Sequence, residues 1–410
     1  MRHAGQMSWR NTFAALRYPN YRLWFLGQLA SMVGTWMQTT AQGYLVYQLT
    51  GSPAYLGYVG FASGVPVWLF TLYGGVVSDR ISRRKLLLIT QTAMMILAFV
   101  LAGLTFTGLV QPWQIIVLSF LLGMANAFDA PARQAFVLEL VEREDLANAI
   151  ALNSTMFNSA AFVGPAVAGV TYALVGPAWC FTINGISFLA VIAALALMHL
   201  KPWVAPLRTK SATAELVEGL QYVRSHSVIR TLIAVGAVMG LFGMAFATLM
   251  PAWAVTVLGG DATTNGLLQS ARGLGSLIAA LMIASLGRFA FKGRLMSVGT
   301  LVFPVFLLIW TVVRWLPLSL LVLVGMGWAM MIVFNLLNAL IQARVDDALR
   351  GRVMSVYSLS FFGFMPISAL MVGTLADATS EPLAVAAMAL VCLGFAVWLW
   401  LRAPQIRKLT

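Results

Sequence analysis

The chain has 410 residues, of which 60% are hydrophobic and 10% are charged, and its mean hydropathy is +0.86. A soluble globular protein is about half apolar and about a quarter charged, so this composition excludes that class. Apolar stretches of about twenty residues recur from end to end, and each can cross about 30 Å of hydrocarbon as a helix. We therefore predict an all-α polytopic membrane protein.

The net charge of +13 would suggest a nucleic-acid partner in a soluble chain. The positions of the cations favour another explanation, because all Lys and Arg residues except Arg272 and Arg314 fall in segments predicted to face one side of the membrane. Short loops rich in Lys and Arg mark the cytoplasmic side. The basic excess is thus interpreted as topological, with some attraction to membrane lipids, and both termini are predicted to be cytoplasmic.

The motifs of catalysis are missing from the sequence. Cys180 and Cys392 both lie in apolar runs, and no His/Cys cluster, phosphate-binding G-x-x-x-x-G-K-[ST] loop or G-x-S-x-G elbow is present. The basic N-terminus also lacks a short apolar stretch with a cleavage site, so no signal peptide is predicted. We expect no enzyme activity, no cofactor and no metal.

Residues 1–20 are interpreted as a cytoplasmic N-terminal segment, either a short interfacial helix or a disordered tail. Twelve spanning helices are predicted after it, over 22–48, 54–78, 86–106, 112–136, 149–174, 178–199, 228–257, 265–286, 295–313, 316–341, 353–375 and 383–401. The polar interval 200–227 is predicted to be a cytoplasmic linker, with a short amphipathic helix from Ser211 to Tyr222, and 402–410 a cytoplasmic tail.

The two halves share a pattern. A shift of 209 residues aligns Gly57 with Gly266 and Gly64 with Gly273, and it carries the basic loop at Arg83 onto Lys292. Parallel six-helix repeats related about the membrane normal are known in transporters. The pattern predicts two pseudo-symmetric six-helix bundles, over 21–199 and 228–401.

A charged loop separates the second and third predicted helices. It resembles the loop signature of the major facilitator superfamily, G-x-x-x-D-R-x-G-R-R, with Ser82 in place of the loop glycine and with matches at Gly75, Asp79, Arg80, Arg83 and Arg84. The resemblance implies the major facilitator fold and a conformational latch, in which Asp79 meets the start of the eleventh helix near Val353. The alternative is a loop that only sets topology.

The segments around Asn20-Tyr21-Arg22, Gly34–Gln38 and Asn126–Gln134 are similar to bacterial exporters grouped with the enterobactin exporter and macrolide-efflux-like proteins. This resemblance implies a monomeric small-molecule transporter of the bacterial inner membrane. Gly164, Pro165 and Gly169 resemble the antiporter motif of export-type members, G-P-x-x-G, with one residue inserted. The alternative for this run is an ordinary small-residue packing face.

Asp129 and Arg133 lie four residues apart, so they share a helix face and can pair. The resemblance instead supports contact of Asp129 with Arg83 or Arg80, which would add Asp129 and Arg133 to the latch. No Asp or Glu falls at mid-membrane depth in the predicted segments. Proton antiport needs a buried titratable group, so Asp129, another ion or little coupling all stay open.

Polar and aromatic residues in the spans are candidates for a substrate cavity. Because the resemblance implies that helices 1, 4, 7 and 10 line it, the candidates on those helices are Trp36, Gln38, Gln42, Asn126, Trp253, Trp328, Asn335 and Asn338. Asn153 and Arg272, in the fifth and eighth predicted helices, are added as a polar residue and a cation within spanning segments. An amide-and-aromatic cavity suits a bulky amphipathic compound. Each amide can alternatively hold two helices together. Arg272 can bind an anionic substrate, or it can pair with Asp261 or a helix carbonyl.

The sequence therefore predicts an exporter that moves a small amphipathic compound, siderophore-like or drug-like, by alternating access between two rocking halves, with protons as a candidate coupling ion. Two other functions stay open. An importer of the same fold differs only in direction, and a membrane scaffold or receptor would need no polar cavity.

Overall fold

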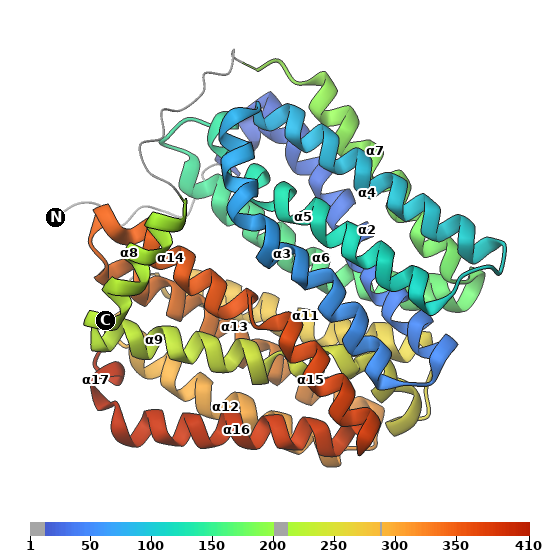
Figure 1. Cartoon of the computed structure of the whole chain (residues 1–410). Coiled ribbons are helices and arrows are strands. Elements are labelled where there is room, and N and C mark those ends of the chain that lie inside the picture. Colours follow the sequence, from blue (N-terminus) through green and yellow to red (C-terminus); the bar gives the residue numbers. More distant parts are fainter. Residues whose placement is uncertain (1–12, 201–211, 288) are drawn as a thin grey trace.

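The computed structural model describes residues 13–200, 212–287 and 289–410, and within these ranges the side chains of 71–80, 212–215 and 348 are not described. The described chain is helical nearly throughout (Figure 1). It begins with a single 3-10 turn, η1 (Ala14–Arg17). Most of the N-terminal segment that was predicted to be an interfacial helix or a tail, including Trp9, lies outside the described residues.

Six long helices follow. They are α2 (Pro19–Thr50), α3 (Pro53–Arg80), α4 (Arg83–Phe106), α5 (Pro112–Leu140), α6 (Leu146–Val175) and α7 (Pro177–Leu197). Four of them begin with proline, whose fixed φ suits a first helical turn and whose missing N–H is not needed there. Gly51, at φ +62°, ends α2 in the left-handed region that glycine adopts without strain.

The second part of the chain is helical with short irregular turns. Its elements are α8 (Ala212–Ser225), α9 (Ser227–Val238), η2 (Met239–Gly243), η3 (Ala245–Leu249), α10 (Met250–Ala252), η4 (Trp253–Val257), α11 (Ala262–Leu286), α12 (Lys292–Val312), α13 (Leu316–Arg344), α14 (Asp347–Phe362), α15 (Met365–Ala378), α16 (Glu381–Arg402) and α17 (Pro404–Arg407). The amphipathic helix predicted from Ser211 corresponds to α8.

Two predicted helices are interrupted. The segment 228–257 contains two π-helical turns, η2 and η4, on either side of Pro251, and the segment 353–375 is divided between α14 and α15 around Gly363. Proline removes a backbone donor and clashes with the preceding turn, which breaks the regular ladder. The eleventh predicted helix also begins earlier than expected, at Asp347 rather than near Val353.

Ten helical stretches within the described residues are long and apolar enough to cross a membrane. They cover ten of the twelve predicted segments; the other two correspond to α2 and α3. Helix α2 is long enough by itself, since 32 residues span about 48 Å, but glutamines, threonines and glycines make it more polar. The count of twelve spans therefore stays a prediction.

Many of the extensively packed helix pairs are not consecutive in the chain. α2 packs against α6 and α7, and α3 and α4 pack against α5, whereas α13 packs against α11 and α12. Figure 1 shows α2–α7 together above α9–α16. A single large apolar cluster runs through α9–α17, and within it the rings of Trp253 and Trp310 stack at 3.8 Å.

Two seams join the early helices to the late ones, α6 against α11 and α3 against α15. A methyl group added at Gly266 would lie 2.5 Å from the carbonyl oxygen of Pro165, and one at Gly57 would lie 2.7 Å from that of Ala369. Only glycine allows the backbones to approach this closely. We call these two contacts the glycine seams.

The two ends of the helix bundle differ in the loops that they carry. We define the basic end as the end that carries the loops at 81–82, 141–145, 287–291 and 345–346. Gly57 and Gly266 lie near the first residues of α3 and α11, so the glycine seams begin at the opposite end. There Ser52 also donates a hydrogen bond of 2.6 Å to Asp377. The early and late helices are thus held together away from the basic end.

Candidate functional site

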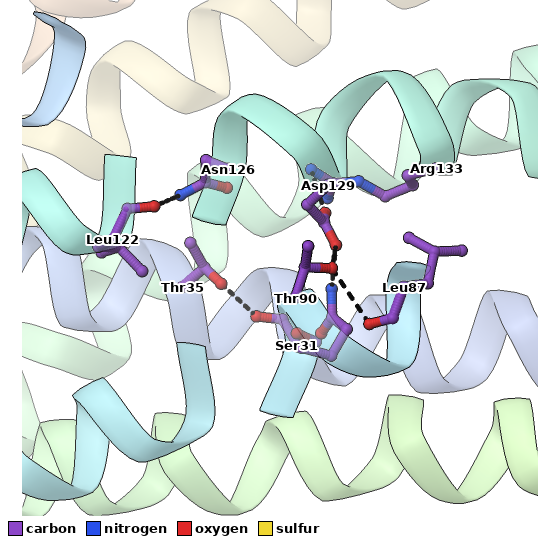
Figure 2. A network of polar contacts seen from close by, with 9 residues as sticks. Ser31, Thr35, Leu87, Thr90, Leu122, Asn126, Asp129 and Arg133 are labelled. Carbon is purple, nitrogen blue, oxygen red and sulfur yellow. Dashed lines mark hydrogen bonds and ion pairs between the residues drawn. The ribbon is translucent and has the colours of Figure 1, made fainter. Parts of the chain in front are cut away.

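A buried carboxylate lies between α4 and α5 (Figure 2). The Asp129 side chain is 1% exposed, and its Oδ1 accepts hydrogen bonds from Thr90 Oγ1 at 2.8 Å and from Gln91 Nε2 at 3.0 Å. Its Oδ2 makes no hydrogen bond and lies 3.3 Å from Arg133 Nη2, one turn along α5. A buried charge needs such partners, because desolvation of an unpaired carboxylate is costly.

Among the described side chains, one cation pairs with Asp129. Arg133 does so, whereas Arg83 forms a 2.5 Å ion pair with Glu139 and Arg80 lies outside the described side chains. The pairing of Asp129 with Arg83 that the resemblance supported is therefore wrong in this structure. Asp129 also lies eleven residues before the end of α5, about 16 Å along the helix axis. It lies deeper than the predicted segment implied, because α5 continues past residue 136 to Leu140.

This carboxylate forms part of the wall of a cavity of about 290 Å³ enclosed by α2, α4, α5, α6 and α7. The wall combines amides, hydroxyls, aromatic rings and methionines, from Ser31, Met32, Thr35, Trp36, Gln38, Thr39, Gln91, Met94, Leu122, Asn126, Asp129, Arg133, Phe157, Asn184 and Phe188. Asn184 donates a hydrogen bond of 2.7 Å to Gln38, which fixes both amides. We call this space the inner cavity.

A second cavity of about 370 Å³ adjoins the first, with Thr35, Thr39, Leu122 and Asn126 lining both. It reaches the late helices, which contribute Ala247, Thr248, Pro251 and Gln269. Gln42 also lines it and donates a hydrogen bond of 2.7 Å to Ser119. The two cavities adjoin through these shared residues; the inner cavity is lined by early helices alone and carries the aromatic rings, whereas the second lies between the early and the late helices.

Arg272 lies on α11 beside these cavities. Its guanidinium carbon is 5.9 Å from the ring centroid of Trp36, and Trp36 packs edge-on against Phe157 at 5.8 Å. Pairing with Asp261 does not occur, because Asp261 instead caps α11 by accepting from the Thr264 N–H at 3.0 Å. The main described contact of the guanidinium is thus a cation–π contact with a residue of the cavity wall.

The charged loop is only partly described. Gly75, Asp79 and Arg80 lie outside the described side chains, so their part in the latch stays a prediction. The described members of the signature make local contacts, since Arg84 Nη2 donates to the carbonyl oxygen of Ala196 at 2.9 Å and Arg83 pairs with Glu139. These contacts tie the start of α4 to α5 and α7.

The glycines of the G-P motif face two different helices. A methyl group at Gly164 would lie 2.5 Å from Trp36 Cβ on α2, whereas one at Gly169 would lie 2.9 Å from the carbonyl oxygen of Ala262 at the start of α11. Pro165 is buried between them. The motif therefore supports close packing of α6 on α2 and on α11, and Gly169 belongs to a glycine seam.

A family model described as transmembrane secretion effector matches residues 10–409. The chain belongs to this family of the major facilitator superfamily. A curated relative, the staphyloferrin A transporter of Staphylococcus aureus, is 24% identical over 87% of this chain and 89% of its own. The enterobactin exporter of Citrobacter koseri is 28% identical over 97% of this chain and 95% of its own. The resemblance to the enterobactin-exporter branch is confirmed.

The fold agrees with this family. The crystal structure of the nucleoside transporter NupG superposes with a TM-score of 0.69 at 14% identity, covering 92% of this chain and 97% of that one. At this identity the likeness concerns the fold alone. Together with the apolar helices and the transporter relatives, it identifies this secretion effector as a multi-pass membrane transporter of the bacterial inner membrane.

Several predicted cavity residues of this transporter lie elsewhere. Trp253 is fully buried in the apolar cluster against Trp310, and Trp328 packs against the same cluster. Asn335 and Asn338 line neither cavity, and Asn338 accepts a hydrogen bond of 2.5 Å from Gln342 on the same helix. Asn153 accepts from Tyr21 at 3.3 Å and holds α6 to α2. Helix rotation decides these positions, and sequence spacing does not give it.

The two hydrogen-bond donors to Asp129 were not predicted. Thr90 and Gln91 are adjacent polar residues within the apolar run of α4. This interruption of the apolar run is the sequence feature that indicates a polar contact inside the membrane. The aromatic residues Phe157 and Phe188 carry no such signal, because phenylalanines occur throughout the apolar helices. Their place in the cavity follows from tertiary packing alone.

Proposed function

We propose that this transporter exports a small amphipathic compound, siderophore-like or drug-like, by alternating access. The observation that carries the proposal is the pair of adjoining cavities, an inner one with aromatic rings, amides, Asp129 and Arg133 in its wall and a second one between the early and late helices. Aromatic faces and a few convergent amides suit an amphipathic molecule. The relatives named above as an enterobactin exporter and a staphyloferrin A transporter support a siderophore-like substrate.

In this proposal twelve helices span the membrane as two six-helix bundles, 21–199 and 228–401, joined by the linker 200–227. The basic end faces the cytoplasm, as do both termini, because short basic loops remain on that side. The glycine seams then close the outer side, and the cavity is reached from the cytoplasm. An exporter needs this state to load its substrate.

We propose that Asp129 couples export to the movement of protons. It is the most deeply buried carboxylate among the described residues, and it lies in the wall of the cavity. Proton uptake would remove its charge and release Arg133, so the ion pair offers a switch between two charge states inside the membrane. Asp79 would act separately as a latch, by accepting hydrogen bonds from the free N–H groups at the start of α14.

Metabolite profiling tests the proposed direction. A deletion strain and strains complemented with wild-type or Asp129→Asn protein would be compared by mass spectrometry of cells and medium. Export predicts a compound that accumulates in deletion cells and is depleted from their medium, with wild-type complementation restoring it. The opposite distribution would identify an importer. Equal profiles for deletion and wild type would contradict transport and favour a scaffold or receptor.

The compound identified in this way then tests coupling in proteoliposomes. We expect transport by the wild-type protein to respond to an imposed pH gradient and transport by Asp129→Asn to lose that response. Glu144→Gln is the matched control, because Glu144 is an exposed carboxylate in the loop between α5 and α6. Transport that ignores the gradient in the wild type would exclude proton antiport.

A further inference from the structure

We infer that Arg272 forms an anion subsite, so that the substrate carries a carboxylate or similar anionic group next to an aromatic body. This inference rests on the proposed function, because it names the chemical class that the exporter's cavity selects. It depends on the position of Arg272, on its lack of a counterion and on the charge of the groups around it.

Arg272 lies at the junction of the early and late helices. It is one helical turn from Gln269, which lines the second cavity, and residues three apart share a helix face. Its guanidinium also approaches Trp36, whose ring lines the inner cavity. Both neighbours thus place the cation next to the walls of the two adjoining cavities.

Among the described residues, the guanidinium has no anionic partner. None of the ion pairs within the described residues includes Arg272, its buried Nε makes no hydrogen bond, and no hydrogen bond to its Nη atoms occurs in that part of the chain. The residue is partly exposed and lines neither cavity itself, but its neighbours Trp36 and Gln269 line one cavity each. An unpaired cation within a membrane helix is costly, which makes a functional partner the natural explanation.

The surrounding charges favour an anion. The carboxylate in the cavity wall, Asp129, is already paired with Arg133, so this pair adds no net charge. Arg272 therefore leaves the region of the two cavities with one uncompensated positive charge. A guanidinium binds a carboxylate through two parallel hydrogen bonds.

The aromatic residues define the rest of the ligand. Trp36 and Phe157 contact each other edge-on, and Phe188 on α7 lines the same cavity. Flat apolar groups stack on such rings, while Trp36 also holds the guanidinium in place through its face. An aryl carboxylate fits this arrangement, with its ring among the aromatic residues and its anion toward Arg272.

Matched probes test the inference on the full-length protein in lipid nanodiscs. Isothermal titration calorimetry would compare 2-naphthoate with 2-naphthamide, which share a ring system and differ in charge. We expect the wild type to bind the carboxylate about tenfold more tightly or better, as a charge-assisted bidentate contact allows. Arg272→Met should lose this preference by weakening carboxylate binding alone. Arg314→Met should keep it, because Arg314 is an exposed arginine that contacts only nearby carbonyls.

The outcomes separate this inference from the proposed function. Equal affinity of the wild type for both probes would overturn the anion subsite and leave an amphipathic cavity in place. Binding of neither probe would overturn the subsite and contradict the aromatic cavity as well. A preference that persists in Arg272→Met would also overturn the subsite and return Arg272 to a structural contact with Trp36.

A second measurement covers the case in which the Arg272 variants do not fold. The wild-type protein would be photolabelled with benzophenone-4-carboxylate, and the labelled peptides identified by mass spectrometry. The inference predicts labels within residues 31–39 or 265–276, competed by excess 2-naphthoate and not by 2-naphthamide. Labels confined to other segments, or equal competition by the amide, would overturn it.

Discussion

The early helices, α2–α7, and the late helices, α9–α16, bury different chemistry. The late helices share one continuous apolar cluster, and among their described residues the two buried amides, Asn265 and Gln269, both lie on α11. The apolar residues of α2–α7 form separate smaller clusters, divided by buried amides and by Asp129. Two groups of helices with a similar plan can therefore have different roles. The early helices hold the polar residues of the cavity, and the late helices form an apolar cluster against which they pack.

This division has a physical reason. A polar group inside a membrane protein must find partners, so polar residues gather where several helices can supply them. Thr90 and Gln91 on α4 supply them to Asp129, and Asn184 on α7 supplies one to Gln38. In the late helices tight apolar packing takes this place, as in the stacking of Trp253 on Trp310. Four predictions test the comparison, from the largest expected effect to the smallest.

The first concerns the apolar cluster. Trp310→Ala should lower the stability by about 3–5 kcal/mol, because it removes a buried ring stacked on Trp253 and a hydrogen bond to Ser319. Thermal unfolding in detergent would measure this loss. The control is Trp113→Ala, whose ring is 62% exposed and which should unfold near the wild-type temperature. Equal losses for the two variants would contradict the role of the cluster.

The second concerns the buried ion pair. Asp129→Asn should cost about 2–3 kcal/mol, below the 3–5 kcal/mol of fully buried pairs, because Arg133 stays 27% exposed. Adding Arg133→Gln should restore part of this stability, since no unpaired charge is then left. Unfolding measurements on both variants form the test. No recovery in the double variant would mean that the charge of Arg133 is not what makes the single change costly.

The third concerns the seam between the regions. Gly273→Ala should destabilise by about 1–3 kcal/mol, because the added methyl would lie 2.4 Å from the carbonyl oxygen of Ala161 and force α6 and α11 apart. Gly394→Ala should instead stabilise by about 0.5–1 kcal/mol, because nothing lies near its added methyl group and alanine favours a helix. Unfolding curves that shift in the same direction would contradict the seam.

The fourth compares one hydrogen bond in each region. Ser119→Ala removes the partner of Gln42, and Ser319→Ala removes the partner of Trp310, each bond being 2.7 Å long. Both should cost about 1 kcal/mol, the usual net value of a hydrogen bond. Only Ser119→Ala should change the affinity for a transported compound, as measured by calorimetry, because Ser119 lines the second cavity. An affinity change in Ser319→Ala alone would reverse the comparison.

Much of the architecture follows from the sequence by itself. Length and apolarity predict every long helix, because a membrane requires about twenty apolar residues and satisfied backbone groups. Prolines and glycines mark the helix ends, as at Pro53, Pro112 and Gly176. The motifs around Arg83 and Asp129 also indicate the family, and the family model confirms it. These features depend on the residues within each segment and not on the helices that pack against it.

Tertiary structure alone decided which polar residues meet. The sequence left Asp129 with three possible cations, and among those with described side chains Arg133 pairs with Asp129 while Arg83 pairs with Glu139. It also ranked Trp36 and Trp253 equally, yet one lines the cavity and the other is buried in the apolar cluster. The physical reason is that a spanning helix is apolar on most sides. Its rotation is therefore set by its neighbours, and only they determine which side chains face the substrate.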